Sequence, residues 1–73
     1  MYKLYIWYPW DFGKWIYKGK FATKKDISEQ ITNKRETTYK IIKGDDVVEY
    51  HEAQGYCWKY GMSRPKPIKV VRV

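Results

Sequence analysis

The stretch that decides the fold is Tyr5–Phe21, YIWYPWDFGKWIYKGKF. Nine of the fourteen aromatic residues of this 73-residue chain lie in its first 21 positions, with lysines between them. Aromatic and β-branched residues favour strands, whereas the central PWDFG holds proline, aspartate and glycine, which form turns. We therefore expect two strands, MYKLYIWY and KWIYKGKF, joined as a β-hairpin.

The register of this hairpin determines which rings are buried. A four-residue loop, 10–13, would pair Tyr8 with Trp15 and Ile6 with Tyr17, so that the more apolar sides of both strands coincide. Because a helix must cover one side of the sheet, we expect this register. It buries Leu4, Ile6, Trp15, Tyr17 and Phe21, and it leaves a surface of Lys3, Tyr5, Trp7, Lys14, Ile16, Lys18 and Lys20.

A loop of three or five residues is the alternative. It would shift the pairing by one residue, which exchanges the two sides of one strand relative to the other. The rings Tyr5, Trp7, Trp15 and Tyr17 would then share one face, and Leu4 and Ile6 would lie with the lysines.

A short helix is predicted within ATKKDISEQITNK, residues 22–34. Thr23 is a suitable N-cap, and Asp26 three positions later is its partner in a capping-box pattern. Ile27 and Ile31 lie one helical turn apart and form an apolar stripe. Asn33 is a residue that readily adopts the left-handed conformation that ends a helix.

The runs ETTYKIIK and VVEYHE flank GDD and predict a second hairpin. A helix over DVVEYHEAQG is the alternative, with a capping box from Asp46 to Glu49 and a C-cap at Gly55. We prefer a strand because Val47 and Val48 are poor helix starters. GYCWKYG, between two glycines, predicts a further short strand.

The C-terminal residues are predicted to lie outside the regular elements of this domain. SRPKP cannot continue a strand, because its prolines lack an amide hydrogen. IKVVRV is either an edge strand or a free segment whose pairing a second copy could complete as a homodimer. We therefore expect an α+β domain of β-β-α-β-β order over residues 1–62, and a proline-containing linker with an extended or β tail over 63–73.

Composition limits the class of protein. The single cysteine, Cys57, excludes an intramolecular disulfide, and no cluster of His and Cys predicts a zinc site. The N-terminus lacks signal-peptide features, and no apolar run approaches the roughly 20 residues of a membrane span. We expect a cytoplasmic protein without a membrane contact, a metal or another cofactor.

Charge is unevenly distributed along the chain. The net charge is +7, and the first 25 and the last 21 residues are basic, whereas residues 26–52 hold seven acids against four bases. A positive field attracts anionic surfaces of any kind and raises association rates.

Catalytic chemistry is poorly supported. His51 and Cys57 could pair as base and nucleophile, but no third group orients them. Asp45 and Asp46 follow Gly44 and are better explained as turn formers than as metal ligands. We expect a non-enzymatic protein with no small-molecule substrate.

Two classes of binding protein remain. A protein-binding module would place lysine-rimmed rings on an acidic site of its partner, whereas a nucleic-acid binder would stack rings on bases and set lysines on phosphates. The acids of the second hairpin, Asp45, Asp46, Glu49 and Glu52, favour a protein partner, because a nucleic-acid footprint avoids acids. The candidate contact residues are Lys3, Tyr5, Trp7, Trp10, Lys14, Lys18, Lys20 and Trp58.

The strings YKGKFATKKDI and TYKIIKGDDVVEY resemble the short β-β-α-β-β proteins encoded in the early regions of bacteriophage genomes. This resemblance covers somewhat more than half of the chain and implies a non-enzymatic inhibitor that binds a host or defence protein in the bacterial cytoplasm. It transfers no site residues, because no shared site motif is visible. The basic charge also differs from that of the acidic nucleic-acid mimics among such inhibitors.

Overall fold

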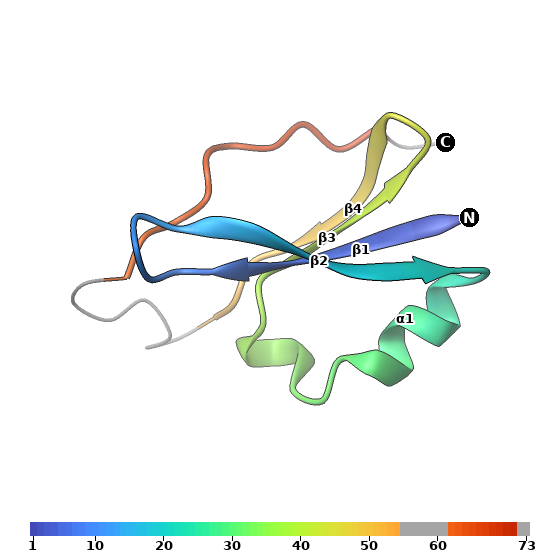
Figure 1. Ribbon diagram of the computed structural model, residues 1–73, viewed down its shortest axis with the longest axis horizontal. Coiled ribbons are helices and arrows are strands. Elements are labelled where there is room, and N and C mark those ends of the chain that lie inside the picture. The colour runs from blue at the N-terminus through green and yellow to red at the C-terminus, as the bar shows by residue number, and fades with distance from the viewer. Residues whose placement is uncertain (55–61, 72–73) are drawn as a thin grey trace.

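A computed structural model of the chain describes residues 1–54 and 62–71, and within them the strands form a four-stranded antiparallel sheet. The sheet order is β2-β1-β3-β4 (Figure 1). The elements are β1 (Tyr2–Tyr8), β2 (Lys14–Phe21), α1 (Lys24–Gln30), a 3-10 turn (Lys34–Glu36), β3 (Tyr39–Lys43) and β4 (Asp46–His51). This order confirms the α+β class and the β-β-α-β-β arrangement.

Helix α1 begins as its sequence predicts. The Thr23 side-chain oxygen accepts a hydrogen bond from the Asp26 amide at 3.2 Å, which caps the first turn. Ile27 and Ile31 are both buried, as expected. The predicted stop at Asn33 is wrong, because the helix already ends at Gln30, with Ile31 as its C-cap, and Asn33 has a φ of −128°. The Asn33 side chain instead donates to Glu36 in the following 3-10 turn.

The core lies between α1 and one side of the sheet, which we call the helix-side face. Leu4, Ile27, Tyr39 and Ile41 are each at most 2% exposed. The core cluster also includes Ile31, and the side chains of Tyr2, Ile6, Phe21 and Val48 pack around it. The expectation that Leu4, Ile6 and Phe21 point toward the helix is therefore confirmed.

The expected register of the first hairpin holds for only half of its length. Tyr2 pairs with Phe21 and Leu4 with Gly19, but beyond Leu4 the register shifts by one residue and Lys18 is left as the extra residue of a β-bulge. Tyr5 then pairs with Tyr17, Ile6 with Ile16, and Trp7 with Trp15.

The expected pairs Tyr8–Trp15 and Ile6–Tyr17 are therefore wrong, because five residues, 9–13, separate the strands instead of four. The shift moves Trp15 and Tyr17 to the face opposite α1, so these rings do not belong to the core. Lys14 and Ile16 exchange sides in the same way and lie opposite Tyr8 and Ile6.

The second hairpin is a hairpin and not a helix. β3 and β4 are antiparallel and join through Gly44 and Asp45, with a φ of +64° at Gly44. A second register shift between Ile41 and Ile42 places Val48 against the core. The preference for a strand over a helix is confirmed.

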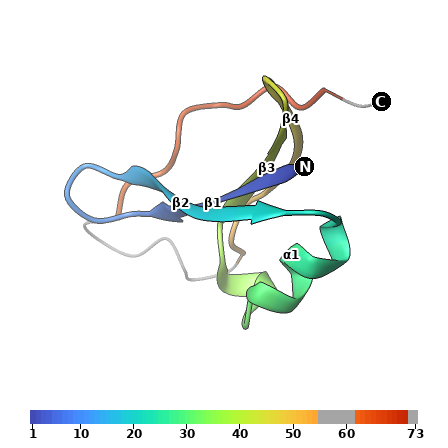
Figure 2. The same cartoon turned by 45° about the vertical axis from the view of Figure 1, so that its right-hand side comes forward.

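Residues 62–71, the C-terminal segment, run along the face opposite α1 (Figures 1 and 2). The Ser63 amide donates to the carbonyl of Pro9 at 2.8 Å, and the Val71 amide donates to the carbonyl of Val47 at 2.8 Å. The segment therefore joins the first hairpin to β4, although its residues form no strand. The strand predicted for GYCWKYG lies outside the described residues. In the described part of the chain, no helix is long and apolar enough to cross a membrane.

Candidate functional site

The sheet face opposite α1, which we call the open face, carries a cluster of aromatic rings. Trp7 and Trp15 meet edge to face with centroids 5.1 Å apart, and the Trp15 and Tyr50 centroids are 6.3 Å apart. Tyr5 and Tyr17 meet at 5.3 Å. The sheet register brings together rings from β1, β2 and β4 that lie up to 45 positions apart in the sequence.

Lys40 of β3 lies among these rings. Its Nζ atom is 4.4 Å from the centroid of the Trp15 ring and 5.3 Å from that of Tyr5, both within range of cation–π attraction. Burial lowers the pKa of the Lys40 ammonium group below its usual value, because a charge is less stable away from water. Among the described residues, no carboxylate lies within ion-pair distance of this Nζ atom.

The β1–β2 loop, 9–13, projects beyond the ends of β1 and β2 (Figure 1). Three consecutive residues, Asp11, Phe12 and Gly13, have φ values of 53°, 71° and 79°, in the left-handed region. That conformation is strained for a bulky side chain such as phenylalanine. Phe12 is 98% exposed, and Trp10, which precedes these three residues, is 46% exposed.

Gly13 permits a close approach between this loop and β1. A Cβ atom at this position would overlap the six-membered ring of Trp7. The same indole donates from Nε1 to the Ser63 carbonyl at 2.6 Å. Trp7 is thus held by the loop on one side and by the C-terminal segment on the other, and it is half-buried.

A groove of about 380 Å³ runs between the first hairpin and the C-terminal segment. The rings of Trp7, Phe12 and Trp15 contribute to it, together with backbone or side-chain atoms of Gly13, Pro67 and Ile68. Four basic residues and no acidic one complete the lining: Lys14, Lys40, Arg64 and Lys66. The Lys14 side chain itself extends toward the Tyr8 ring, on the helix-side face.

The structure places the residues predicted from the sequence in different surroundings. Lys3 and Lys20 pair across β1 and β2 at the end of the open face that is farther from the loop, and Lys18 is the exposed bulge residue. Tyr5 and Trp7 lie on the open face as expected, and neither is beneath the helix. Trp10 is on the loop, and Lys14 lines the groove with its Nζ 5.5 Å from the Tyr8 ring centroid. Trp58 lies outside the described residues.

Sequence reasoning missed Phe12 and Lys40. A phenylalanine inside a turn-forming stretch is itself a signal, because a turn offers little for the ring to pack against. Lys40 lies between the buried Tyr39 and Ile41 in β3, so alternation along the strand predicts that its side chain points to the other face of the sheet. The aromatic rings that surround Lys40 could not be predicted in this way, because they depend on the pairing of β1 with β3.

The acids of the second hairpin lie mostly away from the groove. Asp45 and Asp46 are at the β3–β4 turn, which lies at the opposite end of the molecule from the β1–β2 loop (Figure 1). Glu49 accepts a hydrogen bond from the Tyr39 hydroxyl at 3.0 Å. Glu52 is 3.5 Å from Arg64 and accepts from the Tyr50 hydroxyl, so it is already engaged within the molecule.

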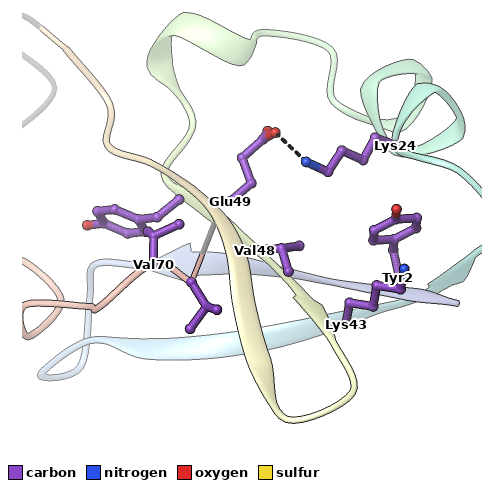
Figure 3. Close-up of a pocket in the computed structure, with 8 residues that line it drawn as sticks. Tyr2, Lys24, Lys43, Val48, Glu49 and Val70 are labelled. Carbon is purple, nitrogen blue, oxygen red and sulfur yellow. Dashed lines mark ion pairs between the residues drawn. The ribbon is translucent and has the colours of Figure 1, made fainter. Parts of the chain in front are cut away.

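A second hollow, of about 590 Å³, lies beside β4. Figure 3 shows Lys24 extending from α1 toward Glu49 of β4, and the two charged groups pair at 3.6 Å. Val48 and Val70 also line this hollow and contribute apolar surface. The Lys24 and Glu49 charges neutralise each other. This hollow therefore offers a charged ligand fewer unpaired charges than the groove does.

Potential catalytic groups are not brought together in the described residues. The Nδ1 atom of His51 lies 2.9 Å from the Thr37 carbonyl, and its ring stacks on Tyr39 with centroids 5.3 Å apart. These contacts engage His51 in packing. Its proposed partner Cys57 lies outside the described residues. Within those residues, no three His, Cys, Asp or Glu side chains gather in a way that could hold a metal ion.

Comparison of this chain with protein-family models, with curated proteins and with solved structures found no match.

Proposed function

We propose that this protein is a non-enzymatic protein-binding module that docks the β1–β2 loop and the adjoining groove on an acidic, partly apolar site of another protein. The observation that carries the proposal is the Phe12 ring, 98% exposed on a left-handed backbone at the tip of the loop. A ring in water and a strained backbone both cost stability, and such costs are typical of functional sites.

The surroundings of Phe12 support a protein partner. Trp10, on the same loop, adds a second exposed ring, and aromatic anchors of this kind are enriched in binding hot spots. Lys14 and Lys66 lie beside the groove and would complement an acidic surface. A phenylalanine side chain gains most when an apolar pocket of a partner covers it.

The expected action is inhibition or assistance of the partner by occupying its surface. The resemblance to short phage proteins supports an inhibitor of a host or defence protein that acts in the cytoplasm. The protein needs no cofactor for this action.

Affinity capture from nuclease-treated extract of the source cell tests the proposal. The wild-type protein should retain a partner, and Phe12→Ser should lose it, because serine removes the anchor and tolerates an exposed turn. Ile16→Ser is the matched control, since it removes an exposed apolar side chain from β2, outside the loop. Equal capture by the wild-type and Phe12→Ser proteins would contradict the proposal.

Binding of single-stranded nucleic acid is the second candidate, and the position of the acids favours it. Asp45 and Asp46 lie far from the basic groove, so they would not repel a phosphate chain there (Figure 1). If this candidate holds, binding to a random-sequence oligonucleotide should weaken steeply between low and moderate salt. Absence of binding at low salt would remove it.

A further inference from the structure

The surroundings of Lys40 leave its ammonium group available to an anion. The rings of Trp15 and Tyr5 attract the charge, and the group keeps access to solvent, because no side-chain nitrogen of the described residues is buried without a hydrogen-bond partner. Lys66 lines the same groove, as does Arg64, which pairs with Glu52 at 3.5 Å, and the lining holds no acid. A basic site of this composition is complementary to an anionic group.

The ring geometry favours a carboxylate over a nucleobase. Stacking of a base requires an open ring face, but the Lys40 ammonium lies over the Trp15 and Tyr5 rings. The Trp7 and Trp15 rings also meet edge to face at an interplanar angle of 65°, so each ring already packs against the other. A carboxylate needs no ring face, because it accepts hydrogen bonds directly from an ammonium group.

We propose that Lys40 is the receptor for a single aspartate or glutamate side chain of the partner protein, which enters the groove between Trp15 and the C-terminal segment. Lys66 attracts the acidic residue from the rim of the groove. This inference rests on the proposed function and adds to it the group that the groove recognises.

The lowered pKa of Lys40 agrees with this role. Because the folded environment disfavours the charged form, the ammonium group does not stabilise the fold near neutral pH as a well-paired charge would. A carboxylate in the groove would favour the charged form and raise this pKa. Lys40→Met should therefore leave the free energy of unfolding nearly unchanged, since methionine keeps most of the apolar contact of the lysine stem.

The matched control is Lys43→Met. Lys43 is on the same strand and its Nζ lies 5.5 Å from the Tyr2 ring centroid, but it faces the helix side of the sheet and does not line the groove. Both variants lower the net charge equally. A difference between them therefore reports the position of the charge and not its amount.

The test is an NMR titration of the full chain at low salt with three probes: blocked hexaglutamate peptide, blocked hexaglutamine peptide and hexathymidylate. Hexaglutamate should bind, and hexaglutamine should not. Lys40→Met should weaken hexaglutamate binding about tenfold, as expected for loss of a charge-assisted hydrogen bond. Lys43→Met should weaken it less than about twofold, and the Lys40 pKa, read from its side-chain carbon shift, should rise on binding.

Equal weakening by the two variants would overturn the inference, because it would show attraction by net charge alone. Tighter binding of hexathymidylate than of hexaglutamate, dependent on Lys40, would overturn it in favour of nucleic acid. The proposed function fails separately, when partner capture does not depend on Phe12.

Discussion

The two halves of the β1–β2 hairpin use the same kinds of residues for opposite purposes. In the half next to α1, Leu4 and Phe21 point toward the helix and build the core. In the half next to the loop, the rings of Trp15 and Tyr17 point to the other face and pack on Trp7 and Tyr5. Lys18, the extra residue of the bulge, separates the two halves.

The difference shows how a single β-hairpin in a small domain can contribute side chains both to the core and to an exposed surface. Side chains alternate strictly along an uninterrupted strand, so a continuous β2 could not direct both Phe21 and Ile16 as observed. One additional residue reverses the alternation. The half near the helix supplies stability, and the half near the loop supplies an aromatic surface that α1 does not cover.

The largest effect should come from truncating the half that faces the helix. Leu4→Ala removes a side chain that is 1% exposed and should lower the free energy of unfolding by about 2–5 kcal/mol. Ile16→Ala, on the neighbouring strand and 37% exposed, should lower it by about 0.5 kcal/mol or less. Urea denaturation followed by circular dichroism measures both, and equal losses would contradict the assignment of the core to the first half.

Removal of the bulge should have the next largest effect. Deletion of Lys18 forces a continuous register, so either Phe21 leaves the core or Trp15 and Tyr17 turn toward the helix. Exposure of a phenylalanine ring costs about 1.5–3 kcal/mol. The Trp7–Trp15 pair should give an exciton signal in circular dichroism that weakens on deletion.

Lys18→Ala is the control for the deletion. It keeps the chain length and therefore the bulge, so its stability should stay within about 0.5 kcal/mol of wild type. If the deletion variant matched Lys18→Ala in both stability and exciton signal, the bulge would not be what separates the halves.

The contact between the loop and Trp7 can be isolated with two glycines. Gly13→Ala and Gly44→Ala both place a Cβ on a residue with positive φ, at 79° and 64°. Only the Cβ at Gly13 meets another group, the Trp7 ring, whereas nothing lies within 4 Å of the one at Gly44. Gly13→Ala should exceed Gly44→Ala in destabilisation by about 1–3 kcal/mol, the usual cost of overpacking. Thermal or urea unfolding measures the difference, and its absence would place Trp7 away from the loop.

The smallest expected effect is on the stability of the fold at high pH, where a tyrosine on each face of the sheet has a raised pKa. Burial, followed by the nearby Glu52, raises the pKa of Tyr50 on the open face from 10.0 to about 12. Burial, followed by a hydrogen bond to Glu49, raises that of Tyr39 on the helix-side face. A raised pKa in the folded state means that the stability is fully present below pH 10.0 and is lost as the pH rises toward 12.

Tyr50→Phe should make this loss shallower, because the variant has no hydroxyl to titrate there. Urea unfolding between pH 9 and pH 12, compared with wild type, measures the slope. An unchanged slope would mean that Tyr50 does not keep its proton more firmly in the folded protein than in the unfolded chain.

Much of the fold was predictable because its signals are local. Turn residues separate the strands, Thr23 caps the helix, and Val47 and Val48 favour a strand. Tyr5 lies on the open face and Trp10 on the loop, as alternation and turn chemistry predict, whereas Lys14 lies on the other face than expected. The bulge was missed, although a glycine inside a strand, Gly19, is a recognised signal of one.

The sequence by itself determined the order of the elements, the helix stripe of Ile27 and Ile31, and the inward side of β1, because these follow from spacing along the chain. Only the tertiary structure decided that Trp15 joins Trp7, that Lys40 lies between rings, and that the C-terminal segment closes one side of the groove. Those contacts join residues far apart in sequence. Each depends on a register that one extra residue can shift, and no local pattern states how many residues a loop will use.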